Sequence, residues 1–188
     1  MLLGTLAAAL AFAGQAQGAP LPLQNAIITA SYNGQASGML GLDHGFADEP
    51  GSNVTALDPT GTGGVEFLTG DYKFGFDFSD TGLLTVMANG FIDAGSYLLR
   101  FDFGDSLALP LTGLSLQGGD IGGIPGLTLI DSHTIGLDLS GVSWRNEFSS
   151  FNVQIDAAVA ADVPEPAAIP LLLAGLAGAA LARRRRQR

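Results

Sequence analysis

Apolar and polar residues alternate with a period of two along much of the chain, and this pattern constrains the fold more than any other feature. The clearest run, residues 72–78, places four aromatic side chains on one side and Lys73, Gly75 and Asp77 on the other. Successive side chains of a strand point to opposite faces, so each such run predicts a strand with one buried face. Four runs have these apolar sides: Tyr72, Phe74, Phe76 and Phe78; Tyr97, Leu99, Phe101 and Phe103; Ile135, Leu137 and Leu139; Phe151, Val153 and Ile155.

Turn residues separate the runs, and no stretch of ten residues between 20 and 160 has the pattern of an amphipathic helix. Asn33-Gly34 and Asn89-Gly90 are typical of hairpin turns, although the connection after Asn89 is longer than two residues. The sequence therefore predicts an all-β fold: an antiparallel β-sandwich or jelly-roll-like domain of nine or so strands. Five further short strands are expected at Ala26–Tyr32, Gly64–Leu68, Leu83–Ala88, Thr112–Gln117 and Leu127–Ile130.

The C-terminal tail has three parts in a fixed order. Pro164-Glu165-Pro166 comes first, the uncharged segment Ala167–Ala182 follows, and the chain ends in a cluster of arginines. The uncharged segment would form a helix of roughly 24 Å, short but usable for crossing a bilayer core of about 30 Å. Positive flanking residues remain cytoplasmic, so we expect a transmembrane helix with everything before it outside. The residues that set this topology are Arg183, Arg184, Arg185 and Arg186.

This arrangement resembles the PEP-CTERM sorting signal of exported bacterial proteins, and the resemblance covers residues 163–188. It implies that a membrane-embedded exosortase recognises Pro164, Glu165 and Pro166 and cuts near them. It also implies an exported protein of a Gram-negative bacterium, with a transient inner-membrane anchor and then a location at the cell surface or outside the cell. Proteins with this signal are generally associated with exopolysaccharide and biofilm, which makes exopolysaccharide an expected partner.

The N-terminus is typical of a secretory signal peptide. Leu2–Ala13 is continuously apolar and small residues follow it, so cleavage by signal peptidase after Ala16 or after Gly18 would fit. The usual positive residues before the apolar stretch are absent. We therefore divide the chain into a signal peptide at residues 1–19, with a signal helix, a β domain at 20–162, and the sorting signal at 163–188.

The charge of the β domain limits the classes of partner that it can bind. Residues 20–162 hold three basic residues against seventeen carboxylates, a formal charge of −14. A domain this acidic is a poor candidate for binding nucleic acid or anionic lipid. The chain has no cysteine, so it has neither disulfide bonds nor thiolate metal ligands.

Catalytic residue types are present, but they do not form a familiar catalytic pattern. Asp131-Ser132-His133 holds the three triad types, yet neighbours in sequence cannot adopt the triad geometry, in which each partner comes from a different element. His44 is interpreted as a solvated loop residue. A secreted two-carboxylate glycosidase leaves no short motif, and Glu66 and Glu147 are its plausible buried pair. We expect no enzymatic activity, with a secreted hydrolase as the less favoured alternative.

Two segments of the chain resemble loops that bind ligands in other proteins. Asp77–Gly82 resembles the first half of an EF-hand loop but lacks its later glutamate, so we interpret it as a turn. Gln117–Gly126 resembles a phosphate-binding loop without its lysine, and we interpret it as a flexible turn. No cofactor is expected, with a looser calcium site as an alternative, formed by converging loop carboxylates such as Asp43, Asp48 or Asp120.

Trp144 is the single tryptophan of the chain. It either stacks on a sugar ring or, as the favoured interpretation, anchors the core at the turn that follows residue 141. Together these observations predict an exported, non-catalytic surface or matrix protein with a structural or adhesive role. The alternative is a carbohydrate- or calcium-binding β-sandwich module.

Overall fold

The computed structural model describes residues 22–42, 53–57 and 64–158, and these residues form strands that pair antiparallel throughout. The antiparallel all-β class is thereby confirmed; the finer jelly-roll assignment stays a prediction. The described part contains no helix long and apolar enough to cross a membrane. The predicted signal peptide, the transmembrane helix, the sorting motif and the arginine cluster lie outside the described residues.

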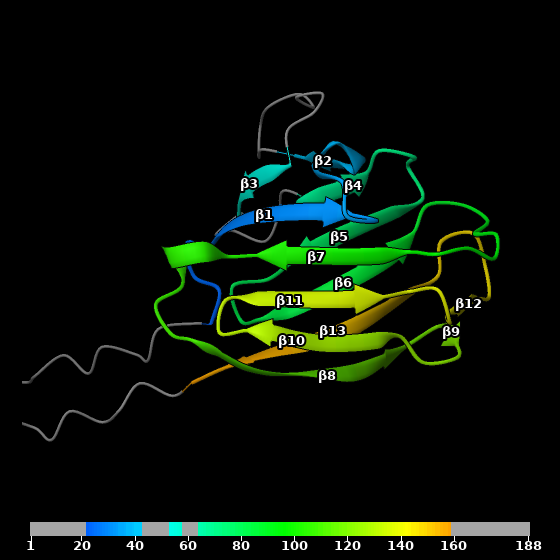
Figure 1. The fold of residues 1–188 in the computed structure, drawn as a ribbon. Coiled ribbons are helices and arrows are strands. Elements are labelled where there is room, and N and C mark those ends of the chain that lie inside the picture. Colours follow the sequence, from blue (N-terminus) through cyan, green and yellow to red (C-terminus); the bar gives the residue numbers. More distant parts are fainter. Residues whose placement is uncertain (1–21, 43–52, 58–63, 159–188) are drawn as a thin grey trace, which may run out of the picture.

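Two sheets form the body of the fold, with a small ribbon at one end (Figure 1). The first sheet has the order β10-β11-β7-β1-β3, made of Gly126–Asp131, Thr134–Asp138, Leu98–Asp102, Ile27–Tyr32 and Val54–Ala56. The second has the order β2-β4-β5-β6-β13-β8, made of Met39–Gly41, Phe67–Thr69, Phe74–Phe78, Leu83–Ala88, Ser150–Ala157 and Leu111–Gly119. The ribbon pairs β9 (Ile121–Gly122) with β12 (Ser143–Trp144), and the two 3-10 helices are η1 (Ala36–Gly38) and η2 (Gly104–Ser106).

Aromatic side chains hold the two sheets together. Phe101 of β7 lies with its ring centroid 5.1 Å from those of Phe76 and Phe78 and 5.8 Å from that of Phe67, which all belong to the second sheet. All four side chains are buried, so the contact is part of the core between the layers. Edge-to-face and tilted geometries of this kind add to the free energy gained from burying the rings. This arrangement is sandwich-like.

The predicted apolar rows are confirmed, with one exception. The rows that begin at Tyr97, Ile135 and Phe151 are buried along their whole length. Tyr72, in contrast, is 54% exposed and has a positive φ of 59°, which places it in the turn before β5. The period-two prediction was therefore extended one step too far at Tyr72, because alternation does not mark where a strand begins.

Strand positions agree with the sequence where the strands are long. Leu83–Ala88 is β6 with the predicted bounds, whereas the strand expected at Gly64–Leu68 begins later, as β4 at Phe67. Glu66 lies just before β4. Its backbone N–H donates to the carbonyl of Phe76 at 2.8 Å, and its buried carboxylate accepts a hydrogen bond from the backbone N–H of Phe78 at 2.6 Å. Four strands of two or three residues, β2, β3, β9 and β12, were not predicted from the sequence.

Two of the predicted turns form and one prediction is wrong. Asn33 and Gly34 both have positive φ (48° and 75°), as a tight hairpin turn with Asn-Gly requires. The turn between β5 and β6 closes through the N–H of Gly82, which donates to the carbonyl of Ser79 at 3.0 Å, so the turn interpretation of this segment is confirmed. Asn89-Gly90 does not make a hairpin, because β6 and β7 belong to different sheets and the chain crosses between the layers there.

The glycine-rich stretch after Gln117 is more ordered than predicted. β8 continues through Gly119, and β9 begins two residues later. A Cβ on Gly119 would collide with the side chain of Phe151 on the neighbouring strand β13. The glycine is therefore needed for the close approach of β8 to β13, and the interpretation as a flexible turn is wrong for this part of the segment.

Candidate functional site

An open hollow of about 470 Å³ lies at the end of the sandwich where β13 begins. Asp120, between β8 and β9, and Ser150 of β13 line it, and its other walls come from the segment that follows β12 and from the segment that follows β6. The two are joined by backbone hydrogen bonds, from the N–H of Ala88 to the carbonyl of Ser149 (2.9 Å) and from the N–H of Gly90 to the carbonyl of Glu147 (2.7 Å). The hollow is thus built on loops that the sheet holds in position, a common arrangement for binding sites.

Two phenylalanines line this hollow and remain largely in solvent. Phe91 is 79% exposed and Phe148 is 72% exposed, although nine of the other phenylalanines and tyrosines in the described residues are buried. Leaving an aromatic ring in water forgoes roughly 1.5 to 3 kcal/mol of burial free energy. Two such exposed rings on one hollow therefore indicate a surface that is suited to binding a ligand or a partner.

Polar groups of the same hollow form a connected set. Asp120, between β8 and β9, accepts a hydrogen bond from the side-chain amide of Asn146 (2.8 Å) and pairs with Arg145 across 3.6 Å. The backbone N–H of Asn146 donates to the hydroxyl of Ser149 at 2.8 Å, which holds the backbone of this segment in place. The arrangement offers donors and acceptors in fixed positions beside the two rings.

Trp144 lies in β12, close to this hollow but packed inward. Its ring centroid is 5.4 Å from that of Phe74 and 5.8 Å from that of Phe151, and the indole is partly buried against the core. These contacts are the ones that the core-anchoring interpretation requires. Sugar stacking on Trp144 stays a prediction.

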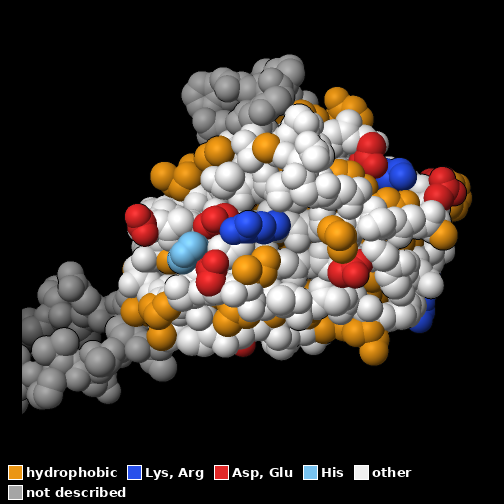
Figure 2. All heavy atoms as spheres, viewed as in Figure 1, with side chains coloured by type: hydrophobic (Ala, Val, Ile, Leu, Met, Phe, Trp, Pro, Cys, Tyr) orange, Lys and Arg blue, Asp and Glu red, His pale blue; other side chains and the backbone are white. Residues whose placement is uncertain are grey.

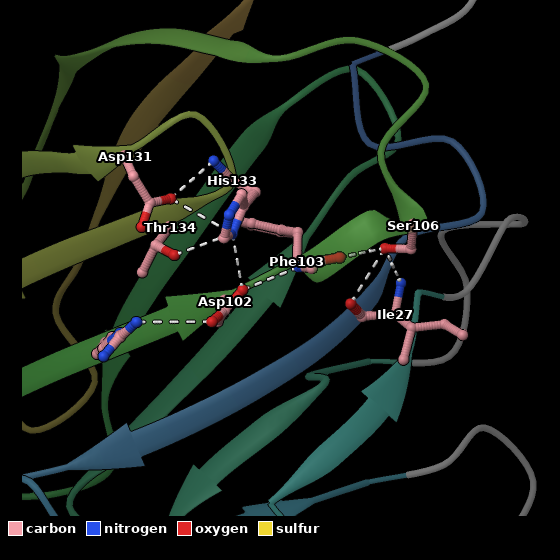
Figure 3. A network of polar contacts seen from close by, with 9 residues as sticks. Ile27, Asp102, Phe103, Ser106, Asp131, His133 and Thr134 are labelled. Carbon is pink, nitrogen blue, oxygen red and sulfur yellow. Dashed lines mark hydrogen bonds and ion pairs between the residues drawn. The ribbon is translucent and has the colours of Figure 1, made fainter.

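A second polar cluster lies near the opposite end of the first sheet, around His133 (Figure 3). Nδ1 of His133 lies 3.1 Å from the carboxylate of Asp102, 3.3 Å from that of Asp131, and 3.2 Å from the hydroxyl of Thr134. Asp102 also pairs with Arg100 at 3.5 Å. Figure 2 shows a histidine side chain at the surface beside acidic and basic side chains.

The His133 cluster joins three strands, β7, β10 and β11, and has no relay geometry. Its three side-chain contacts all use Nδ1, whereas a catalytic triad uses one ring nitrogen toward the carboxylate and the other toward the nucleophile. Thr134 is fully buried, so its hydroxyl is inaccessible to a substrate. Asp102 was not predicted from the sequence, because it lies opposite Thr134 in the pairing of β7 with β11 but 31 residues from His133 in the chain.

Both carboxylates of this cluster have lowered pKa values. Partial burial raises the pKa of Asp102, but the hydrogen bond from the N–H of Gly104 and the neighbouring His133 and Arg100 outweigh burial and lower the pKa overall. The backbone N–H of His133, 3.0 Å from Asp131, is the main cause that lowers the pKa of Asp131. Hydrogen bonds to the charged form stabilise that form, which is the physical reason in both cases.

These shifts predict an acid limb in the stability of the domain. A lowered folded-state pKa contributes stability above the ordinary aspartate value of roughly 3.9, and that contribution is lost as pH falls through the lowered value. Asp102→Asn should therefore reduce the loss of unfolding free energy between pH 7 and pH 2.5, by about 1 kcal/mol or less because the site is partly solvated. Urea unfolding at the two pH values measures this difference.

Asp105→Asn in η2 is the matched control for this prediction, because it removes the same charge and leaves the contacts of His133 in place. An Asp102→Asn variant whose acid limb equals that of the wild-type protein would show that the cluster does not contribute to the acid limb.

The glutamate pair considered for a glycosidase is not a buried pair. Glu66 is buried within the second sheet, but Glu147 is exposed at the hollow. This corrects the expectation that both lie in the interior. The reason is that Glu147 belongs to an irregular segment before β13, where no alternation indicates which side chains turn inward.

Carboxylates do not gather into a metal site in the part of the chain that the structure describes. Within residues 22–42, 53–57 and 64–158, no group of three or more histidine, aspartate or glutamate side chains could hold a metal ion. Asp120 is engaged with Asn146 and Arg145, while Asp43, Asp48 and His44 lie outside the described residues. The calcium alternative stays a prediction.

Comparison with known families gives one match, in the tail. Residues 162–186 match the PEP-CTERM protein-sorting motif, which includes Pro164, Glu165, Pro166 and the arginine cluster. No curated protein and no solved structure matches the chain. The match supports an exported protein that is targeted to exosortase and anchored transiently in the membrane before processing.

Proposed function

We propose that this chain is an exosortase-processed protein of the bacterial cell surface or extracellular matrix, with a non-catalytic, structural or adhesive role. The observation that carries the proposal is the PEP-CTERM motif at residues 162–186. Such a motif at the end of a chain specifies where the preceding domain is delivered, so the domain acts outside the inner membrane of a Gram-negative cell.

The order of parts in the tail supports this route. Proline restricts the backbone to extended forms, so we expect Pro164 and Pro166 to present a segment that a membrane-embedded enzyme can bind as a strand. The uncharged residues 167–182 then hold the chain in the bilayer, and Arg183–Arg186 keep its end in the cytoplasm. Recognition, retention and orientation are thus encoded in consecutive segments.

The described domain suits a role in recognition or scaffolding. It is a strand-rich body held by an aromatic core, and its most distinctive surface feature is the loop-built hollow with Phe91 and Phe148. The high negative charge of residues 20–162 keeps such a domain soluble by self-repulsion. The exposed rings favour one alternative in particular, a carbohydrate-binding module, and an exopolysaccharide matrix would supply its ligand.

The intact mass of the protein released by an exosortase-containing Gram-negative host tests this proposal. We expect a mass that lacks both the N-terminal signal peptide and the arginine tail, and that includes any attached lipid or glycan. A released protein that still carries residues 183–188 would contradict exosortase processing.

The location and role of the released protein need a separate measurement. Fractionation of the culture into cells, matrix and medium should find the processed protein with the cell surface or the matrix. Recovery of nearly all of it as free protein in the medium would contradict the adhesive role and leave the sorting conclusion in place.

A further inference from the structure

We propose that the hollow between Phe91 and Phe148 binds a neutral polysaccharide. The inference rests on the proposed adhesive role outside the cell and names the ligand class of that role. It concerns residues other than Trp144, whose ring packs against the core.

The two phenylalanines provide the apolar part of such a site. The C–H groups on one face of a pyranose ring are weakly positive and apolar, and the face of an aromatic ring is weakly negative. A sugar ring that covers a phenylalanine therefore removes apolar surface from water on both partners. Phe91 and Phe148 lie on different segments, joined by the hydrogen bond between Gly90 and Glu147, so both rings are offered to one ligand.

The polar part is preorganised beside the rings. The carboxylate of Asp120 can accept hydrogen bonds from sugar hydroxyls, while Asn146 and Arg145 can donate to them. Because Asp120 accepts a hydrogen bond from Asn146 (2.8 Å) and pairs with Arg145 (3.6 Å), part of its side-chain freedom is already lost before a ligand binds. Adjacent donors and acceptors of this kind match the neighbouring hydroxyls of a sugar.

The charges of the hollow and of the surrounding domain favour neutral over acidic polysaccharides. Arg145 is the cation among the residues that line the hollow, and it is balanced by Asp120 and by Glu147. The surrounding domain carries a formal charge of −14, so a chain of uronic acids would be repelled. The hollow is also open, which suits an internal stretch of a long glycan.

Affinity electrophoresis tests the proposal with defined probes. The full chain, purified in a neutral detergent, is run through gels that contain dextran, a mixed-linkage β-glucan, a galactomannan or alginate. We expect at least one of the three neutral polysaccharides to retard the protein and alginate to have no effect. Full-length protein is used so that binding is measured whether or not the tail is ever processed.

Substitutions of residues that line the hollow test whether the polysaccharide binds there. Phe91→Ala and Phe148→Ala should each weaken binding by about tenfold, and the double variant should abolish it. Asp120→Asn should also weaken binding, because it removes the charged acceptor. Ile124→Ala is the matched control, since this residue is 80% exposed and does not line the hollow. Urea unfolding of each variant should match that of the wild-type protein.

Three results would overturn the proposal: no retardation by any neutral polysaccharide, unchanged binding by the double variant, or stronger retardation by alginate. Each leaves the sorting conclusion untouched, because that conclusion is tested by the mass of the released protein. Conversely, glycan binding by the full chain, together with a released protein that still carries residues 183–188, would uphold the site and contradict only exosortase processing.

Discussion

Replacing Phe101 by alanine is expected to lower the free energy of unfolding by about 3 to 5 kcal/mol. The side chain is fully buried, and its ring contacts the rings of Phe67, Phe76 and Phe78 across the two sheets. Its removal loses transfer free energy and leaves a cavity at the centre of the layer. A domain of this size has only about 5 to 15 kcal/mol of stability, so urea unfolding should show a large shift of the midpoint.

Phe91→Ala is the matched control, because it is the same substitution at a side chain that is 79% exposed. It should change the unfolding free energy by about 0.5 kcal/mol or less. Equal losses from the two variants would show that Phe101 does not occupy the interface between the sheets, and the packing of the two layers would then have to be reassigned.

Glu165→Ala is expected to abolish removal of the C-terminal tail, so that the protein accumulates in the membrane with its arginines intact. Glu165 is the single charged residue of the Pro-Glu-Pro element, and its carboxylate is the group that an enzyme site can bind most specifically. Membrane fractionation followed by intact-mass measurement separates the processed from the unprocessed chain.

Glu147→Ala makes the same change outside the sorting motif and should be processed normally. The urea unfolding of residues 22–158 should be the same in the Glu165 variant and the wild-type protein, since the motif begins after the described domain ends. Release and trimming of the Glu165 variant at the wild-type rate would refute recognition of the motif through this residue.

The sequence predicted the core of the fold because strands that are buried on one face leave a direct record in the chain. Phe101 and Phe103, for example, alternate with polar residues, and both are buried. Strands of two or three residues leave no such record, which is why β2, β3, β9 and β12 were missed. The exposed position of Tyr72 was missed for a related reason, since a turn residue with positive φ can continue an alternation by coincidence.

The candidate sites were harder to predict because they depend on contacts between distant segments. Asp102 meets His133 only through the pairing of β7 with β11. Phe91 and Phe148 lie 57 positions apart in irregular segments, where no periodicity distinguishes a buried ring from an exposed one. Each of them did carry one usable sign, an isolated aromatic residue next to turn-forming or charged residues rather than within an alternating run.

Strand β13 connects the hollow with the opposite end of the described domain. It starts at the hollow, which Ser150 lines, and its eight residues span about 26 Å. It runs along the sandwich to the opposite end, as Figure 1 shows. There the N–H of Ala158 donates a hydrogen bond to the carbonyl of Pro110 (2.8 Å), and the sorting motif follows within four residues. The hollow and the point from which the chain continues toward the sorting motif therefore lie at opposite ends of β13.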